Sequence, residues 1–189
     1  FKISLFVIGE YKMPALLNHI DPNGLEEFSV VFTDRSLNHM SKEFQKVMCD
    51  LSSNLKEVYN ASAVVLVPGG GTFAMEAVAR QFGIEANVMV IRNGWFSYRW
   101  SQIFESSSSA RSTTVLKARM IGNETLAPFR PTEVNDVIKK IKEDKPNIVF
   151  APHVETSAGV ILPDDYIKKV AAAAHDVGAL MVLDCIASG

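Results

Sequence analysis

The amino-acid sequence predicts an α/β protein with three layers, α/β/α, and a mainly parallel sheet in the middle. Short apolar runs alternate along the chain with longer segments whose apolar residues recur every three or four positions. The short runs, such as residues 87–91 and 147–151, are apolar almost throughout rather than at every second position. That pattern is typical of parallel strands whose two faces are both covered by helices.

The first part of this alternation is predicted as strand, helix, strand and helix, over residues 3–8, 41–59, 63–67 and 72–83. The first of these helices has Ser41 as its expected N-cap, because a serine hydroxyl accepts a hydrogen bond from a first-turn amide. Glu43 follows in its first turn, where the helix dipole favours an acid.

The second part continues with strands and helices in turn, over residues 87–91, 95–104, 112–118, 132–144, 147–151, 163–178 and 179–184. Thr132 is the expected N-cap of one helix, while Pro163 begins the next and Gly178 closes it. The serine-rich residues 105–114 are expected to form a flexible surface connection.

Composition narrows the classes of function and of partner. The 189 residues carry a net charge of −2 and are 48% hydrophobic and 21% charged. This balance argues against nucleic acid and membrane partners. Cys49 and Cys185 stand apart without metal-ligand spacing, so we expect no metal site and a reducing compartment, the cytoplasm.

The carboxyl ends of the predicted strands carry the candidate site, because ligands of parallel sheets bind there. "PGGGTFAMEA" follows one strand, and its glycines and helix start suit a phosphate, although a tight turn alone would explain them. The spacing of Gly69, Gly71 and Ala74 also matches a dinucleotide fingerprint. Arg92 could then face a 2′-phosphate, which keeps an NADP-binding oxidoreductase open as an alternative.

Two further strand ends carry aromatic and polar side chains. In "NGWFSYRW" the rings of Trp95 and Phe96 could stack on a planar cofactor or belong to the core. In "HVETSAG" His153, Glu155 and Ser157 could bind a ligand or cap the loop. A hydrolase triad of these three is disfavoured because the G-x-S-x-G elbow is missing.

Asp184 ends the last predicted strand, after the apolar run "ALMVL". A carboxylate there must be compensated by a cation or by hydrogen bonds. It could therefore hold a protonated ring nitrogen, a metal or a substrate amine, or it could cap the turn that follows.

Together, "PGGGTFAMEA", "NGWFSYRW", "HVETSAG" and "DCIASG" resemble the class V, fold-type I aminotransferases that depend on pyridoxal 5′-phosphate. The similarity is greatest to the alanine–glyoxylate and serine–pyruvate branch, and covers about residues 33–189. It implies a catalytic Asp184 that pairs with the pyridine nitrogen. It implies that Gly70, Gly71 and Thr72 bind the cofactor phosphate. It implies that Phe96, or Trp95 if the register slips by one, stacks on one face of the ring and Ile186 packs on the other. It implies that Thr156 lies near O3′.

The resemblance also implies an activity and an assembly. The expected reaction moves an amino group from a small amino acid to a 2-oxo acid, and the expected assembly is a homodimer. Residues 1–33 would form an N-terminal segment and residues 34–189 an incomplete cofactor-binding large domain. The Schiff-base lysine and the arginine for the substrate carboxylate are expected beyond Gly189, so this chain is expected to be inactive alone. A non-catalytic fragment is the remaining alternative.

Overall fold

The computed structural model describes residues 39–189. The predicted strand at residues 3–8 and the predicted boundary between residues 33 and 34 lie outside this range. The chain divides into two compact units, residues 1–66 and 67–189, and each is described by itself. None of the helices in residues 39–189 is both long enough and apolar enough to cross a membrane.

The described part of the first unit is dominated by helix α1 (Lys42–Val58). Its N-cap is Ser41, whose hydroxyl accepts from the Phe44 amide at 3.1 Å, as predicted. The strand predicted at residues 63–67 is wrong, because this segment forms no strand. A strand needs a neighbour for its backbone hydrogen bonds, and no described residue pairs with these.

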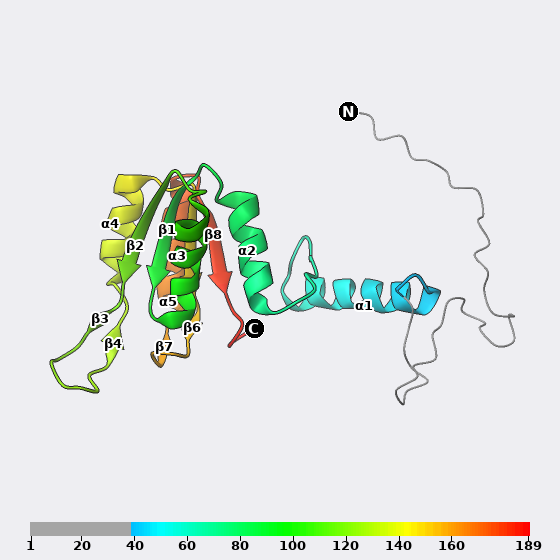
Figure 1. Ribbon diagram of the computed structural model, residues 1–189, viewed down its shortest axis with the longest axis horizontal. Coiled ribbons are helices and arrows are strands. Elements are labelled where there is room, and N and C mark those ends of the chain that lie inside the picture. The colour runs from blue at the N-terminus through cyan, green and yellow to red at the C-terminus, as the bar shows by residue number, and fades with distance from the viewer. Residues whose placement is uncertain (1–38) are drawn as a thin grey trace, which may run out of the picture. The chain divides into compact units, whose positions relative to one another are not determined.

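The second unit is built on a four-stranded parallel sheet in the order β2-β1-β5-β8. Figure 1 shows the sheet with its helices. The strands are β1 (Asn87–Arg92), β2 (Ser112–Lys117), β5 (Ile148–Pro152) and β8 (Leu180–Asp184). The helices are α2 (Gly71–Phe82), α3 (Trp95–Ser107), α4 (Val134–Asp144) and α5 (Asp164–Asp176). The predicted α/β/α architecture is therefore confirmed.

Helices cover both faces of the sheet, which explains why its strands are continuously apolar. Val88 and Val90 of β1 point to the face covered by α2 and α3, where they join a core with Phe150. Met89 and Ile91 point to the opposite face and join the core beneath α4 and α5. All five side chains are at most 2% exposed.

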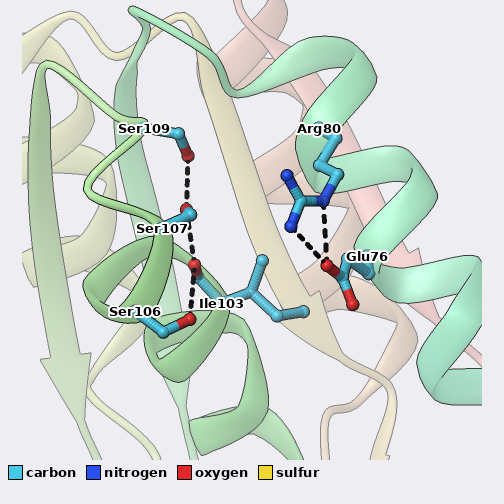
Figure 2. Close-up of polar contacts among 6 residues, drawn as sticks. All are labelled: Glu76, Arg80, Ile103, Ser106, Ser107 and Ser109. Carbon is cyan, nitrogen blue, oxygen red and sulfur yellow. Dashed lines mark hydrogen bonds and ion pairs between the residues drawn. The ribbon is translucent and has the colours of Figure 1, made fainter.

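The serine-rich segment is more ordered than predicted, because α3 extends through it as far as Ser107. The hydroxyls of Ser106 and Ser107 donate to the carbonyl of Ile103 at 3.2 and 2.7 Å, and Ser107 also bonds Ser109 at 2.7 Å (Figure 2). Both hydroxyls therefore bond back to a carbonyl one turn earlier in α3, a local pattern that serine adopts within helices. Of the predicted connection, residues 105–107 are therefore helix, residues 112–114 belong to β2, and only residues 108–111 are loop.

Figure 2 also shows an ion pair on the neighbouring helix α2. Arg80 reaches Glu76 through Nη2 at 2.7 Å and through Nε at 2.8 Å. Both side chains are about half exposed, so the pair contributes little to stability.

Helix α4 begins one residue later than its predicted cap implies. Its N-cap is Glu133, which makes no side-chain capping bond. Thr132 instead donates to the carbonyl of Lys117 at 3.1 Å, which ties this segment to the end of β2. The predicted cap at Thr132 is wrong because this tertiary contact takes its hydroxyl.

Two short antiparallel pairs were not predicted. They are β3 (Arg119–Met120) with β4 (Phe129–Arg130), and β6 (Val154–Glu155) with β7 (Val160–Ile161). Strands of two residues are too short to give a periodic pattern. The β6–β7 pair holds the "HVETSAG" motif directly after β5, which places it at the candidate site.

Candidate functional site

The strand order places a topological switch point between β1 and β5. The chain leaves β1 through α3 to reach β2 on one side, whereas β5 lies on the other side of β1. Connections that leave in opposite directions open a crevice at the carboxyl ends of the strands. The start of α3 and the β6–β7 pair both lie at this point.

Glu155 joins these two segments by capping α3. Its side chain is fully buried and accepts the backbone amides of Phe96 at 3.1 Å and Ser97 at 2.9 Å. The hydroxyl of Ser97 also donates to it, at 2.6 Å, as does that of Ser157. Ser157 in turn accepts the Trp95 amide at 2.8 Å. The backbone that carries Phe96 is therefore held by a carboxylate from the next strand end.

The pKa of Glu155 lies below its usual value. Burial raises this pKa, but hydrogen bonds from Ser157, Ser97 and the Phe96 amide lower it by more. The carboxylate is therefore ionised at neutral pH, and its charge is favourable at the positive end of α3.

The hydrolase-triad arrangement is absent, as the missing elbow predicted. His153 bonds Ser188 through Nδ1 at 2.7 Å instead of Glu155. The loop-capping interpretation of Glu155 and Ser157 is the correct one. Gly94 is needed for it, because a Cβ there would lie 2.7 and 2.8 Å from Cγ and Cδ of Glu155.

A cavity of about 370 Å³ lies between the start of α2, the first turns of α3 and the end of β8. We call it the α2–α3–β8 cavity. Five of the predicted site residues line it: Gly71, Thr72, Phe96, Asp184 and Ile186. Gly70 is adjacent, as the N-cap of α2. Thr156 is not among the lining residues and lies exposed between β6 and β7. The structure therefore brings together segments from three of the four predicted motifs.

The start of α2 offers open backbone donors to this cavity. Its N-cap, Gly70, has no side chain to accept a first-turn amide, and among the described residues the amides of Gly71 and Thr72 meet no acceptor. Gly69 has a φ of 129°, a conformation that favours glycine. Free amides at the positive end of a helix fit a phosphate group.

Asp184 faces the same cavity from the end of β8. One oxygen, Oδ1, accepts the Ile186 amide at 3.1 Å, so the turn-capping interpretation holds for half of the carboxylate. Its other oxygen meets no donor within residues 39–189. Ile186 is 76% exposed and Phe96 40% exposed, and both line the cavity with apolar surface. A carboxylate in a cavity that is also lined by apolar side chains fits a protonated aromatic ring.

Arg99 was missed by the sequence analysis, although it lines the cavity. Its Nη1 donates to Oγ1 of Thr72 at 2.7 Å. A signal was present, because Arg99 comes three residues after Phe96 on a predicted helix and so shares its face.

A second cavity, of about 350 Å³, lies beyond the ends of β1 and β2. It is lined by Arg92, Trp95 and Lys117, and the Arg92 guanidinium stacks over Tyr98 at 4.8 Å. The NADP alternative required Arg92 to share a cavity with the glycine loop, and it does not. Phe96 lines the α2–α3–β8 cavity together with Asp184, whereas Trp95 lines this second cavity.

Comparison with known proteins identifies the family. The model of the family described as Aminotransferase class-V matches residues 25–188. The chain belongs to the class V aminotransferases. This family depends on pyridoxal phosphate, so the predicted family and its cofactor are confirmed.

Individual class V aminotransferases resemble the chain at modest identity. It is 28% identical over 158 residues to 2-aminoethylphosphonate–pyruvate transaminase of Bacillus cereus. The aligned region covers 82% of this chain and 41% of that protein. It is 26% identical over 157 residues to alanine–glyoxylate aminotransferase of Rattus norvegicus, covering 82% and 35%.

A solved class V structure shares the fold. Ureidoglycine–glyoxylate aminotransferase from Bacillus subtilis matches with a TM-score of 0.65 at 26% identity, over 77% of this chain and 35% of that one. The chain thus spans 35–41% of the length of these relatives.

Proposed function

We propose that this chain forms the cofactor-binding part of a pyridoxal-phosphate aminotransferase that acts on a small amino acid and a small 2-oxo acid. The observation that carries the proposal is the α2–α3–β8 cavity. Among residues 39–189, it combines helix amides that meet no acceptor, apolar side chains and an aspartate with one oxygen that meets no donor. An anionic phosphate, a planar ring and a protonated ring nitrogen require these three features.

Each group of the chain has a distinct task in this proposal. The amides of Gly71 and Thr72 bind the phosphate, and Phe96 and Ile186 pack against the ring. The Asp184 carboxylate keeps the proton on the ring nitrogen, because a nearby negative charge favours the protonated form. When bound, the cofactor supplies an electron sink for the substrate Cα. Thr156, predicted to lie near O3′, stays a prediction.

The substrate class is supported by the relatives. The three proteins compared above carry pyruvate or glyoxylate in their names, whereas their amino donors differ. We therefore propose a small 2-oxo acid as the acceptor, with alanine or serine as the expected donor.

A homodimer and a cytoplasmic location also belong to the proposal. The dimer follows from the family resemblance, and light scattering on the purified protein would test it. The location is supported by the free thiols of Cys49 and Cys185, because structural disulfides are rare in reducing compartments. Cell fractionation would test it.

Binding of pyridoxamine 5′-phosphate tests the function directly, because this form of the cofactor needs no lysine to hold it. We expect the 189-residue chain to bind it, as measured by equilibrium dialysis. Asp184→Asn should weaken binding about tenfold or more, since a charged hydrogen bond is worth about 1.5–3 kcal/mol. Asp176→Asn, an exposed acid at the end of α5, is the matched control. Tighter binding of NADPH, or no effect of Asp184→Asn, would contradict the proposal.

A further inference from the structure

Arg99 is a cation of the α2–α3–β8 cavity that pairs with no carboxylate of the described residues. Among the described residues that line the cavity, it alone carries a positive charge. Arg80 and Arg130 each pair with a nearby glutamate, but Arg99 has no carboxylate within 4 Å inside residues 39–189. It is only partly exposed. Partial burial of a charge without a counterion costs free energy, so the Arg99 guanidinium would attract an anion in the cavity.

The hydrogen bond from Arg99 also sets the direction of a hydroxyl. Because the guanidinium donates to Oγ1 of Thr72 at 2.7 Å, the hydroxyl proton of Thr72 is left to donate elsewhere. Thr72 is the second residue of α2 and lines the cavity. Its amide and that of Gly71 are the open donors described above. The arginine therefore adds an oriented hydroxyl and a positive charge to the same helix start.

The guanidinium is held in place from a second side. Its Cζ lies 6.0 Å from the centroid of the Phe96 ring, within the range of a cation–π interaction. The Phe96 backbone is in turn held by Glu155. Arg99 thus connects the start of α2 to the capped start of α3.

We propose that Arg99 is the residue that makes the cavity selective for a phosphorylated ligand. It fixes Thr72 as a donor and supplies the charge that balances a phosphate monoester. This inference rests on the proposed function, since the phosphate is that of the pyridoxal cofactor. Arg99 acts partly through Thr72 and is in that respect a positioning residue.

Two ligands that differ only in the phosphate test the inference. Dissociation constants of pyridoxamine 5′-phosphate and of pyridoxamine are measured for the unsubstituted chain and for Arg99→Gln. We expect Arg99→Gln to weaken pyridoxamine 5′-phosphate about ten- to hundredfold, and pyridoxamine by no more than about twofold. Arg111→Gln removes one positive charge from an exposed position and should leave both constants unchanged.

Two further variants separate positioning from charge alone. Arg99→Lys keeps the charge but loses the planar fork of donors, so it should recover only part of the affinity for the phosphorylated ligand. Thr72→Val removes the hydroxyl, and its effect should be much smaller in the Arg99→Gln background than alone, because the two residues act together.

Each outcome supports or overturns the inference. An equal loss for both ligands in Arg99→Gln would mean that Arg99 only maintains the shape of the cavity, and would overturn it. Unchanged affinity for pyridoxamine 5′-phosphate would overturn it while leaving the proposed function intact. Full affinity in Arg99→Lys, or additive effects with Thr72→Val, would overturn the positioning role. Failure of the unsubstituted chain to bind either ligand would overturn the proposed function as well.

Discussion

Replacing Glu155 by glutamine should destabilise the second unit markedly. The carboxylate receives four donors, two of them backbone amides that cannot rotate away. The glutamine carbonyl replaces only one carboxylate oxygen, while its NH₂ group faces the donors of the other. At least one buried amide, that of Phe96 or Ser97, then loses its acceptor.

The magnitude follows from two contributions. A buried donor without a partner costs about 1–3 kcal/mol, and loss of a negative charge at a helix N-terminus costs roughly 0.3–2 kcal/mol. We therefore expect Glu155→Gln to lower the free energy of unfolding by about 2–4 kcal/mol at pH 7.

The pH dependence provides an independent check. The pKa of Glu155 is lowered in the folded state, so its stabilisation is present above the unfolded-state pKa of glutamate. The stabilisation is lost as the pH falls through the folded-state value. The difference between the unsubstituted chain and Glu155→Gln should therefore narrow on acidification.

Tryptophan fluorescence during urea unfolding is a suitable assay, because both tryptophans of the chain, Trp95 and Trp100, lie in α3. Glu105→Gln, at an exposed position of the same helix, should change the free energy of unfolding by less than about 0.5 kcal/mol. The reasoning is refuted if Glu155→Gln falls within that margin, or if its effect at pH 7 persists undiminished at pH 3.

Three further predictions follow from the packing of the second unit. Gly94→Ala should lower the free energy of unfolding by about 1–3 kcal/mol through steric overlap with Glu155. Gly70→Ala, with open space at Cβ, should change the free energy of unfolding by only about 0.3 kcal/mol. Equal effects of the two substitutions would contradict this prediction. Phe150→Ala should cost about 3–5 kcal/mol in urea unfolding, because the ring is fully buried. Tyr166→Phe should remove a tyrosine that titrates late in an alkaline absorbance titration, since burial raises its pKa to about 12, and should cost about 1 kcal/mol for its lost hydrogen bond.

Local pattern was sufficient for most of the architecture. The apolar runs of β1 and β5 were predicted because each fills a buried strand, and that of β8 because it has the same continuous pattern. The helices were predicted because their apolar residues fill one helix face. The run at residues 63–67 has the same local character, yet it forms no strand. A strand depends on a partner as well as on its own residues, and a sequence pattern does not show whether that partner is present.

The site residues likewise include some that the structure brings together in one cavity and one that it places elsewhere. Gly71, Thr72, Phe96 and Asp184 could be named from the sequence because strand ends and helix starts collect ligands in any parallel sheet. Thr156 carries the same kind of signal, but the β6–β7 turn leaves it exposed outside the cavity.

The sequence by itself thus determined the fold class, the family and the strand ends that bear the site. Only the tertiary structure decided which side chains act together: Glu155 caps a helix 58 residues away in the chain, and Arg99 bonds Thr72 across 27 residues. The reason is physical. Helix and strand periodicity arise from neighbours within a few positions, whereas a carboxylate or guanidinium finds its partner only after the sheet has brought distant segments within hydrogen-bond distance.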